Sequence, residues 1–326
     1  MSLSYYKSPG MVYFLDDDPD YLDMMALVLP RQWCVRLFLH PRDMLDALAG
    51  EHAHWDTDAA AQQAIVTRWR RDQTALVPQI LDHWSLGPQR YGHPQVLLLD
   101  YNMPAMNGLQ VLQVLGDWPG MRVLLTGQAD EQLAVRAFNE GWIHQFLPKQ
   151  TPDIAQHIAE TVNRLQTQAG GRQSQIWRAT LTPHQQALLR APGVGAALAR
   201  RLGERWVEHV VIGEPFGVLG RTAGGAVQWL QLEPAGGLEE LAEMAEAAVS
   251  SFGALAEIRQ GRQLVDLDLR NSLGESVQAP RLATAFPIGQ DEALLGAFFD
   301  LDDRRLAPAT SYDAWLSSQP ERAVEG

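Results

Sequence analysis

The sequence predicts an α/β protein with a doubly wound, five-stranded parallel sheet and a helical insertion, followed by a second, α+β domain. Three observations predict it. Four aliphatic residues, 96–99, run directly into Asp100, which is typical of a strand buried on both faces of a parallel sheet. Apolar runs of this kind alternate with segments of helical spacing through the first half of the chain. The length of 326 residues favours two domains over one.

The composition disfavours several classes of protein. The net charge of −13 argues against a general affinity for nucleic acid. No run approaches the roughly 20 apolar residues that span a bilayer, so we expect no membrane segment. The only cysteine, Cys34, rules out an internal disulfide and favours a reducing compartment. We therefore expect a soluble, cytoplasmic protein, with residues 1–10 as a disordered or tag-like start.

The chain from residue 11 begins with a strand that ends in acidic residues. An apolar run at 12–15 leads into Asp16-Asp17-Asp18. Pro19 suits the first turn of the following helix, because its missing N–H is not needed there, and Asp18 is interpreted as the residue that starts this helix. The next elements are expected to be a strand and a helix, at residues 33–39 and 41–48.

A helical insertion interrupts this pattern at about residues 51–90. More than fifty residues separate the second strand from residue 96, whereas a whole crossover needs only about 10–12. Residues 59–70 and 74–84 carry apolar side chains at helical spacing. His52 and His54 lie in this insertion, and we interpret them as surface polar residues in preference to metal ligands.

The remaining strands of the first half also end at polar residues. Asn107-Gly108 signals a turn before a helix. A strand at 121–125 leads into Thr126, and a last strand at 143–147 leads into Pro148-Lys149. Further helices are expected at 109–115, at 130–139 and, after Thr151-Pro152, up to about residue 166.

Five polar residues therefore follow predicted strands: Asp16, Asp17, Asp100, Thr126 and Lys149. The carboxyl ends of parallel strands meet at one edge of a sheet, so we expect these side chains to lie together. Three clustered carboxylates repel one another unless a cation lies among them, and hard oxygen ligands suit Mg²⁺. A free carboxylate there can attack phosphorus and become an aspartyl phosphate. Mg²⁺ and a lysine can supply the charge neutralisation that phosphoryl transfer requires.

Residues 11–166 resemble the receiver domain of two-component response regulators. The matching motifs occur in the right order on the right elements and cover roughly half the chain. The resemblance implies a flavodoxin-like fold. The motifs are Asp16-Asp17 after the first strand, LDYNMP at 99–104 with Gly108, LTGQAD at 125–130 and FLPK at 146–149.

The resemblance implies a role for each acidic residue of this edge. Asp100 would be the phosphoacceptor. Asp16 and Asp17 would hold Mg²⁺ together with Asp100, directly or through water. Asn102 would add its backbone carbonyl to the ligands of the metal.

The resemblance also assigns the residues that would respond to phosphorylation. Thr126 would be the switch hydroxyl, Phe146 the aromatic residue that changes rotamer, and Lys149 the lysine that pairs with phosphate. Members of the family usually carry proline after this lysine, often as a cis peptide, whereas here Pro148 precedes Lys149. That departure puts the geometry of the loop in question. The long insertion is the second departure from the family's pattern.

The second half is expected to be an α+β domain at about residues 177–310, after a small, polar linker at 167–176 and before a C-terminal tail at 311–326. Its element order is similar to that of PAS or GAF sensor modules, but only by analogy. It contains no recognised DNA-reading, cyclic-dinucleotide, kinase or nucleotide-binding motif. The expected elements are a helix at 176–190, a hairpin at 209–232, one helix at 238–255, a strand at 264–269 and a hairpin at 282–301.

These features predict a phosphorylation-controlled switch and not an enzyme. A partner sensor histidine kinase would pass a phosphoryl group to Asp100, and this would change homodimerisation or the contacts of a binding or sensory second domain. The alternative is a receiver-gated enzyme of unrecognised type in residues 180–310, and DNA binding is a third, weaker alternative. An enzyme needs a pocket with convergent polar groups and perturbed acids, whereas a binding module needs an exposed or apolar surface.

Overall fold

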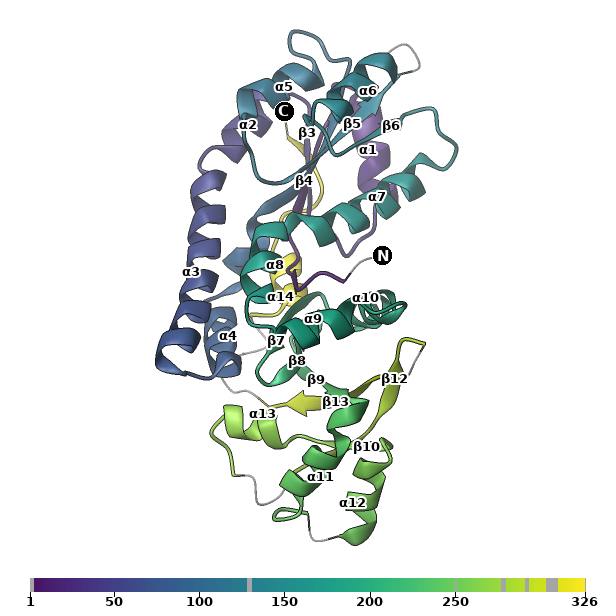
Figure 1. Ribbon diagram of the computed structural model, residues 1–326. Coiled ribbons are helices and arrows are strands. Elements are labelled where there is room, and N and C mark those ends of the chain that lie inside the picture. The colour runs from purple at the N-terminus through teal and green to yellow at the C-terminus, as the bar shows by residue number, and fades with distance from the viewer. Residues whose placement is uncertain are drawn as a thin grey trace. The chain divides into compact units, whose positions relative to one another are not determined.

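A computed structural model describes residues 3–127, 131–249, 251–276, 280–290, 293–302 and 310–325. Its contacts divide the chain into two compact units, whose elements are labelled in Figure 1. The parallel-sheet unit comprises residues 9–58, 88–170 and 315–326. The antiparallel-sheet unit comprises residues 1–8, 59–87 and 171–314. Each unit therefore draws on three separate stretches of the chain.

The parallel-sheet unit is built on a six-stranded sheet in which all neighbouring strands are parallel. The five expected strands are present, and a short strand from the C-terminal end is the sixth. The order across the sheet is β14 (Val324–Glu325), β3 (Val35–Phe38), β2 (Met11–Leu15), β4 (Pro94–Asp100), β5 (Met121–Thr126) and β6 (Gln145–Pro148).

Strand β4 confirms the prediction of a strand buried on both faces, because all of its residues are buried. Val96 and Leu98 pack into one hydrophobic cluster with residues of α1 (Pro19–Val28) and α7 (Ile154–Ala169). Leu97 and Leu99 point to the opposite face and are equally buried. Helices therefore cover both faces of this sheet, as its apolar strands require. The other helices of the parallel-sheet unit are α2 (Pro41–Leu48), η1 (Pro88–Gly92), α5 (Gly108–Leu115), α6 (Glu131–Asn139) and α14 (Tyr312–Ser317). Helix α14 begins in the antiparallel-sheet unit and continues into this unit after residue 314.

Local capping explains where α1 begins. The carboxylate of Asp18 accepts hydrogen bonds from the N–H groups of Asp20 and Tyr21, at 3.0 Å and 3.2 Å. Pro19 occupies the first turn, where its missing N–H costs nothing. Asp18 is thus the helix-start residue that the sequence predicts. Helix α7 differs from expectation, since it begins at Ile154 and not directly after Thr151-Pro152.

The C-terminal residues form part of the parallel-sheet unit, where the sequence predicted only a tail. Val324 pairs with Leu37 of β3, and Nε of Arg36 donates to Oε1 of Glu325 at 2.7 Å. The guanidinium of Arg322 donates to the carbonyls of Leu29 and Trp33, both at 2.9 Å, just after α1. The last carbonyls of a helix have no partner within it, so an arginine there is stabilising.

The antiparallel-sheet unit contains a second six-stranded sheet, whose paired strands are all antiparallel. A separate two-stranded ladder joins β10 (Gln263–Val265) and β11 (Leu282–Thr284). The unit therefore has the α+β character that the sequence predicts. The order in the larger sheet is β1 (Tyr6–Lys7), β7 (Glu208–Gly213), β8 (Phe216–Arg221), β9 (Val227–Pro234), β13 (Leu294–Leu301) and β12 (Phe286–Ile288).

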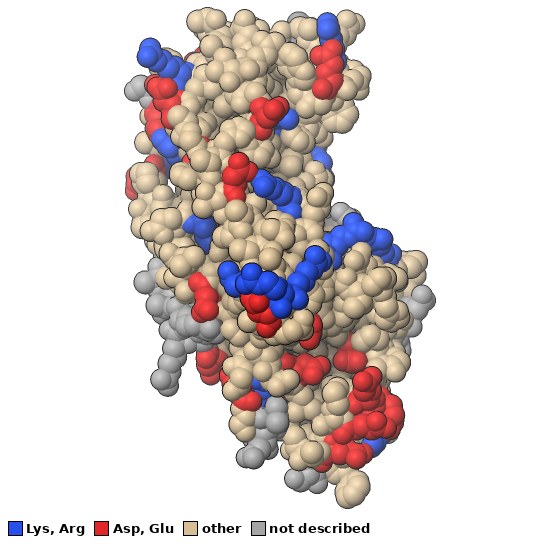
Figure 2. Space-filling view, turned by 60° about the vertical axis from the view of Figure 1, so that its left-hand side comes forward, with Lys and Arg blue, Asp and Glu red and all other residues tan. Residues whose placement is uncertain are grey.

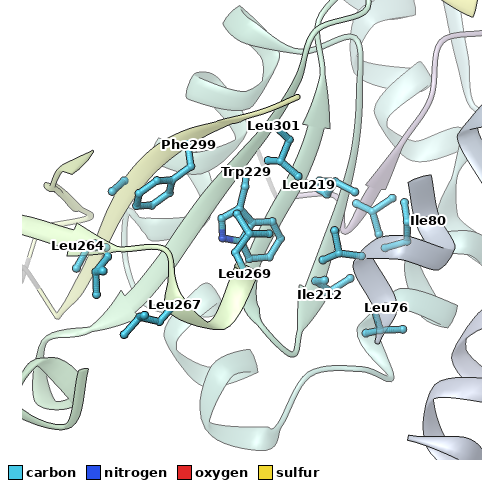
Figure 3. Packing of buried hydrophobic residues seen from close by; sticks show 14 of the residues in the cluster. Leu76, Ile80, Ile212, Leu219, Trp229, Leu264, Leu267, Leu269, Phe299 and Leu301 are labelled. Atoms are coloured by element: carbon cyan, nitrogen blue, oxygen red, sulfur yellow. The ribbon is translucent and has the colours of Figure 1, made fainter. Parts of the chain in front are cut away.

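Both faces of this sheet are covered by helices. On one face Ile212, Leu219 and Trp229 belong to a cluster that includes residues of α4 (Leu76–Ser85), α11 (Leu238–Ala245) and α12 (Phe252–Arg259). Figure 3 shows Trp229 near the middle of the labelled side chains of this cluster. On the other face Val218 and Leu230 pack with residues of α9 (Pro183–Arg190) and α10 (Val194–Arg205). Two further helices are α8 (Gly171–Arg178) and α13 (Leu267–Ser272).

Several boundaries differ from those expected. Residues 3–10 include strand β1, in which Tyr6 is buried, where the sequence predicted a disordered or tag-like start. The expected linker at 167–176 is helical, because α7 runs to Ala169 and α8 begins at Gly171. The expected hairpin at 209–232 has three strands, since a turn at 214–215 divides its first run. The single helix at 238–255 is two helices, α11 and α12.

Helix α3 (Glu51–Asp72) contributes to both units. Its residues 51–58 belong to the parallel-sheet unit, and its remainder belongs to the antiparallel-sheet unit, where Ile65 and Val66 join the cluster of Figure 3. In that unit Trp177 donates its indole N–H to Oε1 of Gln62 at 2.6 Å. The expected insertion is therefore helical, but most of it packs with the second half of the chain. Among the described helices, none combines the length and apolar character of a membrane span.

The C-terminal residues give a first testable prediction. We expect Arg322→Ala to lower the free energy of unfolding by about 2–3 kcal/mol, because several carbonyls lose a charged donor. Urea unfolding followed by circular dichroism measures the change. Arg31→Ala is the control, because it removes an exposed arginine from the loop whose carbonyls Arg322 contacts. It should leave the free energy of unfolding nearly unchanged. Equal losses in the two variants would contradict the assigned role of Arg322.

Candidate functional site

Four strand ends bring the predicted site residues to one edge of the parallel sheet. Asp16 directly follows β2, Asp100 is the last residue of β4, and Thr126 is the last residue of β5. Lys149 directly follows β6, and its N–H donates to the carbonyl of Thr126 at 2.9 Å. The parallel register places these residues side by side, as the strand-end argument predicts.

The side chain of Lys149 joins two buried carboxylates. Its Nζ lies 2.7 Å from Oδ2 of Asp16 and 2.7 Å from Oδ1 of Asp100. Asp16 is fully buried and Asp100 is 4% exposed, so neither carboxylate is well hydrated. Such charges are costly to bury unless they are paired. The ammonium therefore holds the two carboxylates in place.

Burial and the neighbouring charges shift the pKa values of the side chains at this edge. Burial raises the pKa of Asp16 to about 6, and the hydrogen bond with Lys149 only partly opposes it. Burial also opposes protonation of Lys149, but its hydrogen bonds with Asp100 and Asp16 outweigh this and raise its pKa. Lys149 thus remains a cation throughout the neutral range.

The acidic cluster could bind a metal ion. One carboxylate oxygen from each of Asp16, Asp17 and Asp100 lies within 4.8 Å of the others. Three carboxylates and one ammonium leave two negative charges, which a divalent cation balances. The ligand atoms are hard oxygens, and Asp17 is exposed, so water can complete the coordination. The residues present therefore fit a hard divalent ion.

Backbone groups orient the carboxylates that would hold this ion. Oδ1 of Asp16 accepts a hydrogen bond from the N–H of Asp18 at 3.2 Å. Oδ2 of Asp100 accepts one from the N–H of Asn102 at 3.0 Å. Gly108 lets α5 approach this edge, because a Cβ atom there would lie only 2.5 Å from the carbonyl oxygen of Asp100.

Of the two predicted switch residues, Thr126 ends β5 at this edge, and Phe146 lies in β6 three residues before Lys149. Thr126 is fully buried, and its hydroxyl has no hydrogen-bond partner among the described residues. The rest of its motif, residues 128–130, lies outside the described part of the chain. Phe146 of β6 pairs in register with Leu124 and is half-buried. An unpartnered hydroxyl at this place is available to a ligand.

Proline before Lys149 does not prevent the lysine from reaching the cluster. Pro148 lies in β6 opposite Thr126. Strand β6 is the last strand in the sheet order, and an edge strand tolerates a residue without an N–H on its open side. The ammonium group still lies between Asp16 and Asp100.

Sequence reasoning missed Tyr21 as a site residue, because Tyr21 lies in helix α1 and does not follow a strand. Nζ of Lys149 lies 4.8 Å from the centre of its ring, within cation–π range. Burial, followed by the charges of Asp16 and Asp100, raises the pKa of Tyr21, so its hydroxyl stays neutral. An aromatic residue in the first turn after an acidic pair is the signal that could have revealed it.

The antiparallel-sheet unit has a separate cavity of about 670 Å³. Burial raises the pKa of Glu233 in this cavity to about 7, and the charges of Asp268 and Glu240 add to the shift. Burial also raises the pKa of Asp268, with Glu214 and Glu240 nearby. No lysine or arginine is among its described lining residues. The cavity therefore has the convergent acids expected of a binding or catalytic pocket.

The comparisons with known proteins locate similarity in the fold and not in the sequence. No protein-family model matches the chain, and no curated protein matches its sequence. Some solved structures match about half of this chain. The adenylate cyclase from Rhodopirellula baltica covers 53% of this chain and 99% of its own, with 19% identity and a TM-score of 0.33. A response regulator receiver domain from Clostridium thermocellum covers 51% and 98%, with 16% identity and a TM-score of 0.33.

Another matching solved structure covers both units. It is the response regulator LqsR of Legionella pneumophila, with a TM-score of 0.69 and 24% identity. The match covers 97% of this chain and 96% of LqsR. The parallel-sheet unit has the flavodoxin-like fold that the resemblance implies, with β14 as an additional edge strand. The chain is therefore similar in fold, along nearly its whole length, to the LqsR response regulator.

Proposed function

We propose that this protein is a two-component response regulator, whose parallel-sheet unit is a receiver that accepts a phosphoryl group on Asp100. The observation that carries the proposal is the position of Lys149, whose ammonium lies 2.7 Å from both Asp16 and Asp100, beside the exposed Asp17. The full-length similarity in fold to LqsR supports it. The donor would be the phosphohistidine of a partner sensor kinase.

The geometry suggests how each residue contributes to the transfer. Mg²⁺, held by Asp16, Asp17, Asp100 and the backbone carbonyl of Asn102, would supply charge neutralisation on the phosphoryl oxygens. A carboxylate oxygen of Asp100 attacks phosphorus, and the bond from phosphorus to the imidazole nitrogen of the kinase breaks. Lys149 then pairs with a phosphoryl oxygen.

The response to phosphorylation would begin at Thr126. Its buried hydroxyl has no partner among the described residues, so it can donate to a phosphoryl oxygen. Movement of Thr126 would free space for Phe146 to change rotamer. Apolar residues that lie 43–48% exposed on α6, namely Leu133, Val135 and Phe138, support a homodimer surface that responds to this change. Changed contacts of the antiparallel-sheet unit are the other output that we propose.

The second unit is proposed as a binding or sensory module and not a DNA reader. On the face drawn in Figure 2 a run of basic side chains has acidic ones directly beside it, and acidic side chains gather elsewhere on the same face; the net charge of the chain is −13. A DNA-binding surface needs a concentration of basic side chains. The buried state of the only cysteine and the phosphorelay chemistry support a cytoplasmic location.

The acidic cavity favours a second candidate function within the antiparallel-sheet unit. Glu214, Glu233, Glu240 and Asp268 line it, and Trp69 adds an aromatic ring. Carboxylates with an aromatic wall suit a small ligand that carries a positive charge. The unit would then bind such a ligand, with or without converting it, under control of the receiver.

Labelling tests the phosphoacceptor. We expect acetyl phosphate with Mg²⁺ to label the wild-type chain and Asp23→Asn, which changes an exposed carboxylate on α1. Asp100→Asn should take up no label, because an amide cannot attack phosphorus, and a chelator should remove labelling of the wild type. Undiminished labelling of Asp100→Asn would refute the assignment.

A further prediction tests Lys149. Lys149→Arg keeps the positive charge, but a guanidinium cannot take the compact place between Asp16 and Asp100. We expect the variant to lose the phosphate-dependent change in oligomeric state, measured by light scattering after acetyl phosphate treatment. Gln150→Ala, in the same loop, is the control. A normal response of Lys149→Arg would count against the proposal.

Another prediction tests the cavity through the pH dependence of stability. The pKa of Glu233 is raised in the folded state from 4.5 to about 7, so stability is lost as the pH rises through that range. The neutral variant Glu233→Gln should exceed the wild type in unfolding free energy by about 1–3 kcal/mol near pH 8.5 and nearly match it near pH 5. Glu204→Gln, at an exposed site, should match the wild type throughout. The same pH dependence in wild type and Glu233→Gln would contradict this account.

A further inference from the structure

A second group of metal-binding side chains lies in the parallel-sheet unit, away from Asp100. Glu51 is the first residue of α3, and His54 follows one turn later. His93 directly precedes β4, whose far end is Asp100. One ligand atom from each of Glu51, His54 and His93 lies within 4.8 Å of the others. These residues are distant in the sequence and meet only through the fold.

The contacts within this group are long for charge-assisted hydrogen bonds, although the contact of Glu51 with His93 is within hydrogen-bond reach. Oε2 of Glu51 lies 3.3 Å from Nδ1 of His93, and Oε1 lies 3.5 Å from Nδ1 of His54. A charge-assisted hydrogen bond is shorter, at about 2.7–2.9 Å. A tetrahedral ion with ligands at about 2.0–2.1 Å keeps them about 3.3–3.4 Å apart. The two contacts involve different oxygens of Glu51, so a bound ion would draw one ligand atom from each residue together from positions that already lie within 4.8 Å of one another.

The donor atoms select a class of metal. Two imidazole nitrogens and one carboxylate oxygen suit Zn²⁺ and the neighbouring first-row ions, whereas Mg²⁺ prefers oxygen alone. The cluster around Asp100 offers only oxygens, so the two groups would take different ions. Three protein ligands leave one position of a tetrahedron for water.

The group is partly preorganised and also open to solvent. The side chains of Glu51 and His93 are 13% and 24% exposed, while that of His54 is 62% exposed. The carbonyl of His93 accepts a hydrogen bond from the N–H of Met11 at 2.9 Å, which fixes its backbone against β2. Gly10 permits this approach, since a Cβ atom there would lie 2.7 Å from the same carbonyl. An ion can therefore enter past His54 to two ligands that are already held.

We propose that Glu51, His54 and His93 form a second metal site, which takes Zn²⁺ or a similar first-row ion and joins the first turn of α3 to the start of β4. Two ligands come from one helical turn and the third from the opposite end of the phosphoacceptor strand. The ion would replace the long contacts between Glu51 and the two histidines with one coordinate bond to each of the three side chains. It would also fix the end of a helix whose remaining residues belong to the antiparallel-sheet unit.

Cobalt titration of the full chain tests this proposal. The protein, prepared without a polyhistidine tag and stripped with a chelator, is titrated with Co²⁺ in excess Mg²⁺, and the visible absorption of tetrahedral Co²⁺ is recorded. We expect one equivalent to bind and Zn²⁺ to displace it. His54→Ala and His93→Ala should each weaken binding more than about 100-fold, because loss even of an outer partner costs about 10–100-fold.

Two control variants distinguish this site from binding at a nearby histidine or at the acidic cluster. His52→Ala removes an exposed histidine from the same helical turn and should leave Co²⁺ binding unchanged. Asp100→Asn should also leave it unchanged, so failure of the phosphoacceptor assignment would not affect this test. The proposal is overturned if no stoichiometric Co²⁺ binding occurs, if His54→Ala and His93→Ala bind like the wild type, or if His52→Ala loses as much affinity as they do. Because His54 is largely exposed, its variant can be expected to fold.

Discussion

Two carboxylates, those of Asp16 and Asp100, are buried at the carboxyl edge of the parallel sheet, and one ammonium lies 2.7 Å from each of them. Removing one partner of such a buried group typically costs about 3–5 kcal/mol, because the remaining charges are left without compensation. The site is therefore stable only while β2, β4 and β6 keep their register. The same arrangement leaves a net negative charge at the edge, and this explains why the site fits a divalent cation.

The main site could be predicted because its chemistry is encoded locally. Asp16, Asp100 and Lys149 each stand next to an apolar run, and parallel strands bring such ends together. The contribution of Tyr21 could not be predicted in this way, since a helical pattern tells apolar from polar faces but not which ring lies over an ammonium. Whether Pro148 disturbs the position of Lys149 could not be predicted either, because the answer depends on whether β6 is an edge strand of the sheet.

The fold was predictable where its elements are long or have a strong apolar pattern. It was less predictable where contacts between distant parts of the chain determine the structure. The apolar strand β4 is an example of the first kind. Strand β1 has only two residues, and its pairing with β7 joins parts of the chain that no local pattern connects. Helix α3 was expected as part of one insertion, yet its residues divide between two units, because packing and not helical propensity decides which core a helix joins. His93 was overlooked as a partner of His54 because the two residues are far apart in the sequence and only the fold brings them together.

Strand β14 has a consequence for how the protein is made. The ribosome must synthesise the whole of the antiparallel-sheet unit before residues 322–325 emerge, so β3 remains the open edge of a five-stranded sheet for much of translation. An unpaired edge is a place where nascent chains can associate wrongly. An insertion placed directly after β14 would crowd this pairing, whereas an insertion in an exposed loop would leave it intact.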